Sequence, residues 1–199
     1  MMLIKFSQTF QANRYIFVCM ILAKDEQKIF FTNFYPLLHY AAVYSGLVPE
    51  GTVFDVFLKT DLVLHAQSRN AIFQDKDLLD DYASDNARFL NKRLPSFVPA
   101  LKKAIFSDFI VLKQEKQFGI FMDRKTGLFY HVGAITTPFD EVLKFMPGYC
   151  QTALFNFNNR IVWDGLAIQK PKELSPALEQ TLLQKYDAAL KAKKVIELL

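Results

Sequence analysis

FSDFIVLKQEKQFGIFMDRKTGLFYHVGAI, residues 106–135, decides the fold class of this chain. Aromatic and β-branched residues, which are typical of strands, alternate in it with a polar loop at 123–127 that ends in glycine. The same alternation continues over residues 149–157 and 160–169, around Asn158-Asn159, a pair that suits a two-residue turn. We therefore expect residues 105–168 to form a continuous antiparallel sheet. About five strands would follow one another as a meander with one face covered by helices.

The residues before this sheet have helical patterns. Apolar side chains recur every three or four positions over residues 24–45, which predicts a helix with a kink or a break at Pro36. Further helices are expected over residues 54–70 and 75–83. Residues 91–99 contain two prolines and predict an ordered crossover into the sheet.

The chain ends in another helical pattern. Ser175-Pro176 is a cap followed by proline at the first helical position, and it predicts a helix over residues 175–198. The predicted fold class is α+β, as one domain over residues 1–199. Its parts are a mainly helical 1–100, an antiparallel sheet over 101–170 and a C-terminal helix within 171–199.

Composition limits the classes of function. The chain has 199 residues, 51% hydrophobic and 22% charged, which excludes an intrinsically disordered protein. Its formal net charge of +4 is too small to require a nucleic-acid or membrane partner. Basic residues do gather over 88–125, and RNA or DNA binding there stays open as an alternative.

Cysteine usage predicts a reducing compartment. Cys19 and Cys150 are the only cysteines, too few for a disulfide framework, and neither has a second ligand at zinc spacing. We expect two buried thiols, no bound metal and a cytoplasmic protein. The apolar run at Tyr15–Ala23 is too short to cross a bilayer, so we expect a buried strand or helix. A signal-peptide core is the alternative for this run.

Asp164 is the most distinctive candidate site residue. It follows the only tryptophan, Trp163, in an apolar strand, where a carboxylate must be solvated, paired or hydrogen-bonded. The functional interpretation is a carboxylate at a pocket rim. The structural one is a bulge in which Asp164 accepts from backbone amides and Gly165 supplies the bend. We expect Arg160 or His131 to supply any counter-charge, Asp164→Asn to cost little, and Asp164→Ala to cost about 1–3 kcal/mol.

His131 lies in a predicted strand between Phe129 and Gly133. A histidine in the middle of a sheet must find a hydrogen-bonding partner, so His131 and Asp164 are the candidate catalytic residues. Trp163 and Arg160 are the candidate ligand-binding residues.

The common catalytic motifs are missing from the sequence. It contains no phosphate-binding glycine loop, no nucleophile elbow and no metal-binding His or Cys pair, so no cofactor is expected. We expect a soluble, non-catalytic binding or protein-interaction module, with a protein or a small ligand as its partner and no membrane partner. The alternative is an enzyme with a site near His131 and Asp164. The sequence leaves the oligomeric state open.

Several segments together suggest a family. They are the 24–44 helix, residues 69–73 with 78–82, the aromatic hairpin at 109–135, and residues 152–157 leading into 161–166. In these the chain resembles a poorly characterised group of bacterial proteins with a helical first half and a β-rich second half. Some members end in a Cys/His zinc tail like that of the preprotein translocase ATPase. No cysteine follows Cys150 here, so the resemblance implies the architecture and bacterial origin but no metal site or catalytic residue.

Overall fold

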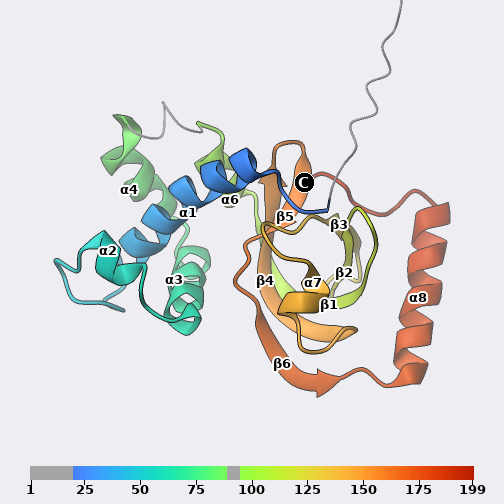
Figure 1. Cartoon of the computed structure of the whole chain (residues 1–199). Coiled ribbons are helices and arrows are strands. Elements are labelled where there is room, and N and C mark those ends of the chain that lie inside the picture. Colours follow the sequence, from blue (N-terminus) through green and yellow to red (C-terminus); the bar gives the residue numbers. More distant parts are fainter. Residues whose placement is uncertain (1–19, 89–94) are drawn as a thin grey trace, which may run out of the picture.

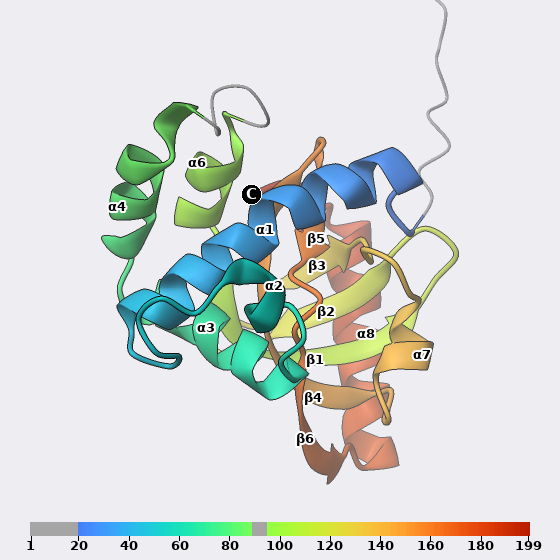
Figure 2. The ribbon, with the colours of Figure 1, turned by 60° about the vertical axis from the view of Figure 1, so that its left-hand side comes forward.

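The computed structural model describes residues 20–88 and 95–199. Its helices are α1 (Lys24–Tyr44), α2 (Phe54–Phe57), α3 (Leu62–Gln74), α4 (Leu78–Asp85), α6 (Phe97–Lys102), α7 (Phe139–Val142) and α8 (Pro176–Lys191). Its strands are β1 (Ile105–Gln114), β2 (Gly119–Asp123), β3 (Phe129–Val132), β4 (Gly148–Phe157), β5 (Arg160–Trp163) and β6 (Ile168–Glu173). The first helices lie on one side of a curled sheet and α8 lies on the other (Figures 1 and 2). The predicted α+β class is confirmed.

Helix α1 begins and ends close to its predicted bounds, but it runs through Pro36 without a break. A proline inside a helix removes one backbone hydrogen bond. The buried stripe on both sides of it, which includes Phe34 and Leu37, packs into the core, and the helix continues past the proline. Packing therefore outweighs the local cost of the proline.

The single helix predicted over residues 54–70 is wrong, because the chain forms α2 and α3 there instead. Asp61 begins the second helix, and its carboxylate accepts a hydrogen bond of 2.8 Å from the backbone N–H of Leu64. This N-cap satisfies an otherwise unpaired amide and starts a new helix axis. Helix α4 agrees with the helix predicted at 75–83 except at its ends. Of the predicted crossover at 91–99, residues 91–94 lie outside the described residues, and residues 97–99 form the first turn of α6.

Both predicted hairpin turns are confirmed. Gly127 has a φ of 73° in the turn between β2 and β3, and Asn158 and Asn159 have φ values of 49° and 60° between β4 and β5. The strand predicted over 160–169 is interrupted, however, and becomes β5 and β6, which both pair with β4.

The order of the strands differs from the predicted meander. The sheet runs β3-β2-β1-β4-β5, with β6 also beside β4, and its named strands pair antiparallel. Strand β4 lies against β1 rather than against β3. The connection through α7 is too long for a tight hairpin, and it carries the chain across to the other side of β1.

The two ends of the sheet meet, so the sheet curls toward a closed barrel (Figure 1). The backbone N–H of Gly133 donates to the Ile161 carbonyl at 2.8 Å, and Trp163 N–H donates to the Gly133 carbonyl at 3.3 Å. A Cβ at Gly133 would lie 3.3 Å from the Met20 carbonyl oxygen, so a glycine permits this close approach.

The run at Tyr15–Ala23, predicted as a buried strand or helix, is described only from Met20 onward. Leu22 N–H donates to the Ala134 carbonyl at 3.1 Å, and Ala134 N–H donates to the Met20 carbonyl at 2.8 Å. Met20 and Leu22 are both buried. Residues 15–19 lie outside the described part of the chain.

Two apolar cores lie on opposite faces of the sheet. The larger one fills the space between the sheet and the N-terminal helices, and the smaller one lies under α8. Because both faces of β1 are covered, Phe109, Ile110, Val111 and Leu112 are all buried, and the prediction of one covered face is wrong.

Helix α8 ends at Lys191 rather than at 198. The following residues return to the sheet, where Ile196 N–H donates to the Phe129 carbonyl at 2.9 Å and His131 N–H donates to the Ile196 carbonyl at 3.0 Å. The chain after α8 therefore lies beside β3. Among the helices of residues 20–88 and 95–199, none has the length and apolar character that a membrane span needs.

Candidate binding pocket between the helices and the sheet

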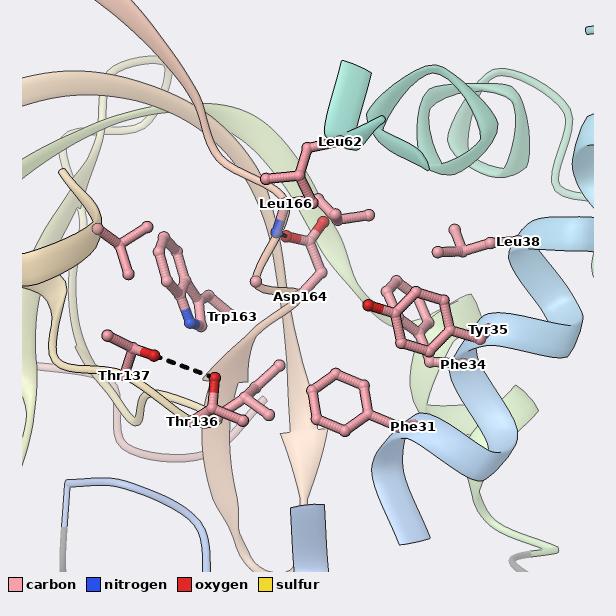
Figure 3. Close-up of a pocket in the computed structure, with 13 residues that line it drawn as sticks. Phe31, Phe34, Tyr35, Leu38, Leu62, Thr136, Thr137, Trp163, Asp164 and Leu166 are labelled. Atoms are coloured by element: carbon pink, nitrogen blue, oxygen red, sulfur yellow. Dashed lines mark hydrogen bonds between the residues drawn. The ribbon is translucent and has the colours of Figure 1, made fainter. Parts of the chain in front are cut away.

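A cavity of about 190 Å³, which we call the seam pocket, lies where α1 faces the ends of β3 and β5 (Figure 3). Both halves of the molecule contribute to its wall. Its lining residues are Phe31, Phe34, Tyr35, Leu38, Leu62, Ile135, Thr136, Thr137, Val142, Trp163, Asp164, Gly165 and Leu166.

Helix α1 supplies one wall of the seam pocket because its spacing places Phe31, Tyr35 and Leu38 on one face. The rings of Phe31 and Tyr35 stack with centroids 5.4 Å apart, and the rings of Tyr35 and His65 pack edge to face with centroids 5.5 Å apart. These contacts hold the Tyr35 ring in place. Its hydroxyl points into the pocket (Figure 3), and burial raises the pKa of Tyr35.

Trp163 forms the opposite wall at the end of β5. Its indole is only 2% exposed and packs edge to face against Phe139, with ring centroids 4.9 Å apart. The indole nitrogen points toward the Thr136–Thr137 side of the pocket (Figure 3). The hydroxyl oxygens of these two threonines lie 3.3 Å apart.

Asp164 faces the same region, but its carboxylate is fully occupied by donors. Oδ1 accepts from Thr152 Oγ1 at 2.7 Å and from Leu166 N–H at 2.8 Å. Oδ2 accepts from Ala153 N–H at 3.2 Å and from the Arg69 guanidinium. Four donors occupy the two carboxylate oxygens, so the carboxylate has little capacity left to accept a hydrogen bond from a ligand.

The counter-charge of Asp164 is Arg69 of α3. The prediction that Arg160 or His131 supplies this counter-charge is wrong. Both side chains of the Arg69–Asp164 pair are 0% exposed. The Arg69 guanidinium also lies over the Phe106 ring at 4.9 Å, and its Nε donates to Asn70 Oδ1 at 2.8 Å. The expected backbone amides and the bend are present, since Gly165 has a φ of 76°. The chain leaves the strand there rather than forming a bulge within it.

Cys150 lies close to this ion pair. Burial, followed by the charge of Asp164, raises the pKa of the Cys150 thiol to about 12. The thiol is therefore protonated at neutral pH and is a poor nucleophile. Cys150 is buried and unbridged as expected, and Cys19 lies outside the described residues.

His131 and Arg160 line a second cavity of about 210 Å³, which does not include Asp164 or Trp163. The Arg160 guanidinium pairs with Glu26 at 2.5 Å, and this contact ties the β4–β5 hairpin to the start of α1. The structure therefore places the four candidate residues in two separate cavities. His131 and Asp164 do not share one.

His131 connects three segments. Its Nδ1 lies 3.0 Å from Glu197 Oε1, its Nε2 lies 2.8 Å from the Tyr186 hydroxyl, and its ring stacks on Phe118 with centroids 3.6 Å apart. Burial lowers the pKa of His131 although Glu197 raises it. Tyr186 is 5% exposed and does not line the cavity, so this chain of groups attaches α8 and the following segment to β3.

The basic residues of 88–125 are spread over several elements, and three of them are paired with carboxylates. Lys102 pairs with Asp80, Lys113 with Glu115 at 2.6 Å, and Arg124 with Asp108 at 3.6 Å. Lys92 and Arg93 lie outside the described residues. Pairing reduces the positive charge that this region offers to a phosphate backbone.

Sequence reasoning did not assign roles to Arg69 or Tyr35. One signal for Arg69 was present, because His65, Ser68 and Arg69 occupy the buried face of α3 together with Ile72. Polar side chains at the core-facing positions of a helix indicate partners elsewhere in the fold. Nothing local to Tyr35 distinguishes it from an ordinary core tyrosine.

No three or more His, Cys, Asp or Glu side chains are grouped to hold a metal ion within residues 20–88 and 95–199. Comparisons of the chain with protein-family models, with curated proteins and with solved structures found no match.

Proposed function

We propose that this chain is a non-catalytic binding module of the bacterial cytoplasm, and that the seam pocket is its ligand site. One observation carries the proposal: an aromatic-lined cavity lies between the two halves of the molecule, and its only carboxylate is fully occupied by donors. Ligand sites in proteins are typically concave, mostly apolar and provided with a few polar groups. The cytoplasmic location rests on the cysteine usage, and the bacterial origin on the resemblance described above.

The lining supports binding rather than chemistry. Its members other than Asp164 carry uncharged side chains, and Tyr35 has a raised pKa that keeps it protonated at neutral pH. A general base must reach the proton of its substrate with a free lone pair, and an activated nucleophile needs such a base nearby. The described lining offers hydrogen bonds and apolar contact instead.

The test is a thermal-shift and fluorescence screen of the whole protein against a library of monocyclic fragments. Trp163, the only tryptophan, lines the pocket and reports its occupation directly. We expect some fragments to raise the melting temperature and to change the Trp163 emission. Thr136 is exposed at the pocket, so Thr136→Phe should fill the opening and abolish both effects without disturbing the core.

Thr181→Phe is the matched control, since Thr181 is exposed on α8, on the other side of the sheet. It should bind fragments as the wild type does. The proposal fails if no fragment binds, or if fragments bind the Thr136→Phe and wild-type proteins equally well.

A second candidate function is protein interaction through α2 and the start of α3. Large apolar side chains are exposed there, including Val53 at 61%, Val56 at 55% and Leu62 at 70%. Contiguous exposed apolar residues often mark interaction surfaces. Sedimentation of the wild type and of Val56→Lys over a range of concentrations tests for self-association, which the substitution should weaken. A wild type that stays monomeric at all concentrations excludes a second copy as the partner.

A further inference from the structure

Trp163 presents an unused hydrogen-bond donor to the seam pocket. In residues 20–88 and 95–199, its indole N–H has no hydrogen-bond partner. The fully buried side-chain atoms that lack a partner there are His65 Nδ1, Arg69 Nη2 and Asp108 Oδ1. The indole nitrogen is not among them, so it borders open space, and the space at this position is the pocket (Figure 3). An indole N–H can only donate, so its complement is an acceptor atom.

Tyr35 offers a second polar group from the opposite wall. Its hydroxyl likewise has no hydrogen-bond partner in the described part of the chain, and it points into the pocket. The stacked Phe31 ring and the edge-to-face packing with the His65 ring hold the tyrosine ring in position. The hydroxyl can donate to an acceptor or accept from a donor.

The pocket has no free charge for an ionised ligand. Its only charged side chain is Asp164, which Arg69 and three further donors neutralise and satisfy. A ligand carboxylate or ammonium group would lose its hydration without gaining a counter-ion. The lining therefore favours an uncharged ligand.

Size limits the ligand further. A cavity of about 190 Å³ is below the range of roughly 300–1,000 Å³ that is usual for drug-sized ligands. Aromatic and aliphatic side chains make up most of its wall, which suits a single apolar ring or a short apolar chain.

We infer that the seam pocket binds a compact, neutral compound with an apolar ring and a carbonyl oxygen that accepts from the Trp163 indole N–H. Tyr35 supplies the second hydrogen bond. This inference rests on the proposed function, because it names the class of ligand for the same pocket. In this inference, Trp163 is the residue that selects for a ligand with an acceptor atom. The ligand is neutral because the described pocket lining has no cation to pair with a charged ligand.

Three probes that share one six-membered aromatic ring separate the effects of the acceptor atom, the ligand charge and the apolar ring. Benzamide carries a neutral carbonyl, benzoate carries an anion of similar shape, and toluene has no acceptor. Each is titrated into the ¹⁵N-labelled wild-type protein. A chain with one tryptophan gives one indole N–H signal, so the NMR assignment is unambiguous.

We expect benzamide to move the indole proton downfield with saturation, and toluene to bind without that movement. Benzamide should bind about fivefold more tightly than toluene, the effect of one net hydrogen bond, and benzoate should be the weakest probe. Trp163→Phe should remove the preference for benzamide while toluene still binds. Tyr44→Phe, a matched change of an exposed aromatic residue on α1, should leave all three affinities unchanged.

The outcomes distinguish the inference from the proposed function. Toluene and benzamide binding equally, with no downfield movement, overturns the ligand class but leaves the pocket as a binding site. Benzoate as the tightest probe overturns neutrality. If none of the probes and no library fragment binds, both proposals fail. The wild-type signal decides the matter even if Trp163→Phe unfolds, since it does not depend on the variant.

Discussion

The carboxylate of Asp164 and the guanidinium of Arg69 are two opposite charges removed from water at the junction of helices and sheet. Burying either charge alone is costly, and their attraction with the surrounding donors compensates for this cost. Asp164 was recognisable in the sequence as a residue that needs partners. Its main partner lies 95 residues away on another element, beyond the reach of any local pattern.

The Arg69–Asp164 pair changes the expected cost of substitution. Asp164→Ala should lower the free energy of unfolding by about 3–5 kcal/mol, because Arg69 stays buried without a counter-charge. Asp164→Asn should also destabilise the protein, by roughly 1–3 kcal/mol, because its amide faces groups that all donate. The earlier expectation that Asp164→Asn costs little is therefore replaced. Urea denaturation measures both variants.

Two further variants sharpen this prediction. The double substitution Arg69→Met with Asp164→Leu should recover much of the loss, because no charge remains buried. Asp80→Asn is the control, because Asp80 pairs with Lys102 at the surface and should contribute less than about 1 kcal/mol. A double variant as unstable as Asp164→Ala would contradict the account.

At the scale of elements, α8 and the segment after it are attached to β3 through His131. The Tyr186 hydroxyl comes from α8, Glu197 comes from the returning segment, and His131 lies between them on the strand. Periodicity predicted the helix but not the return of the chain. The residues after Lys191 pair with the sheet only because β3 offers unpaired backbone groups at that edge.

The attachment through His131 should depend on pH. Burial lowers the pKa of His131 in the folded state below its ordinary value of 6.5, so the unfolded chain binds the proton more readily. The folded state is therefore most stable, as far as His131 contributes, above about pH 7, where His131 is neutral in both states. This contribution to the free energy of unfolding is lost as the pH falls below 6.5 toward the folded-state pKa of His131. Urea denaturation at pH 7.5 and pH 5.5 should show a smaller loss of stability in His131→Gln than in the wild type.

Glu197→Gln should have the opposite effect on this profile. Glu197 raises the pKa of His131, as Glu115 does, so removing the Glu197 charge lowers that pKa further and steepens the loss. Two other ionisable side chains lie near His131: Tyr186, which is protonated over this range, and Arg160, which lines the same cavity. Identical profiles for the wild type and both variants would exclude His131 as the titrating group.

At the scale of the whole molecule, the larger core joins the helices to the sheet. Phe30 of α1 stacks on Phe155 of β4 with centroids 5.9 Å apart, and Phe97 of α6 packs against both rings. The seam pocket lies within this same boundary between the two halves. A boundary built from shared aromatic rings is expected to couple the halves in folding.

We therefore predict one cooperative unfolding transition for the chain. Far-UV circular dichroism follows mainly the helices, and Trp163 fluorescence follows the end of β5. The two signals should give the same melting temperature, because neither half retains its core when the other unfolds. Two separate midpoints would show that the helical part and the sheet are independent domains.

The sequence by itself determined the parts of this fold that depend on near neighbours. The aromatic runs of 106–135, the glycine turn at 123–127 and the Asn158-Asn159 turn each specify their structure within a few residues. The apolar stripe over residues 24–44 likewise specified helix α1, and the packing of that stripe outweighs the local cost of Pro36. These signals were sufficient for the α+β class and for most of the elements.

Only the tertiary structure decided which of these elements lie together. Strand β4 pairs with β1, β3 meets β5, and Arg69 reaches Asp164, and each of these contacts joins residues far apart in the chain. Local periodicity specifies which face of an element is buried, but not the face that it meets. The seam pocket exists because α1 and the end of β5 meet there. A local sequence pattern does not specify which distant elements come together.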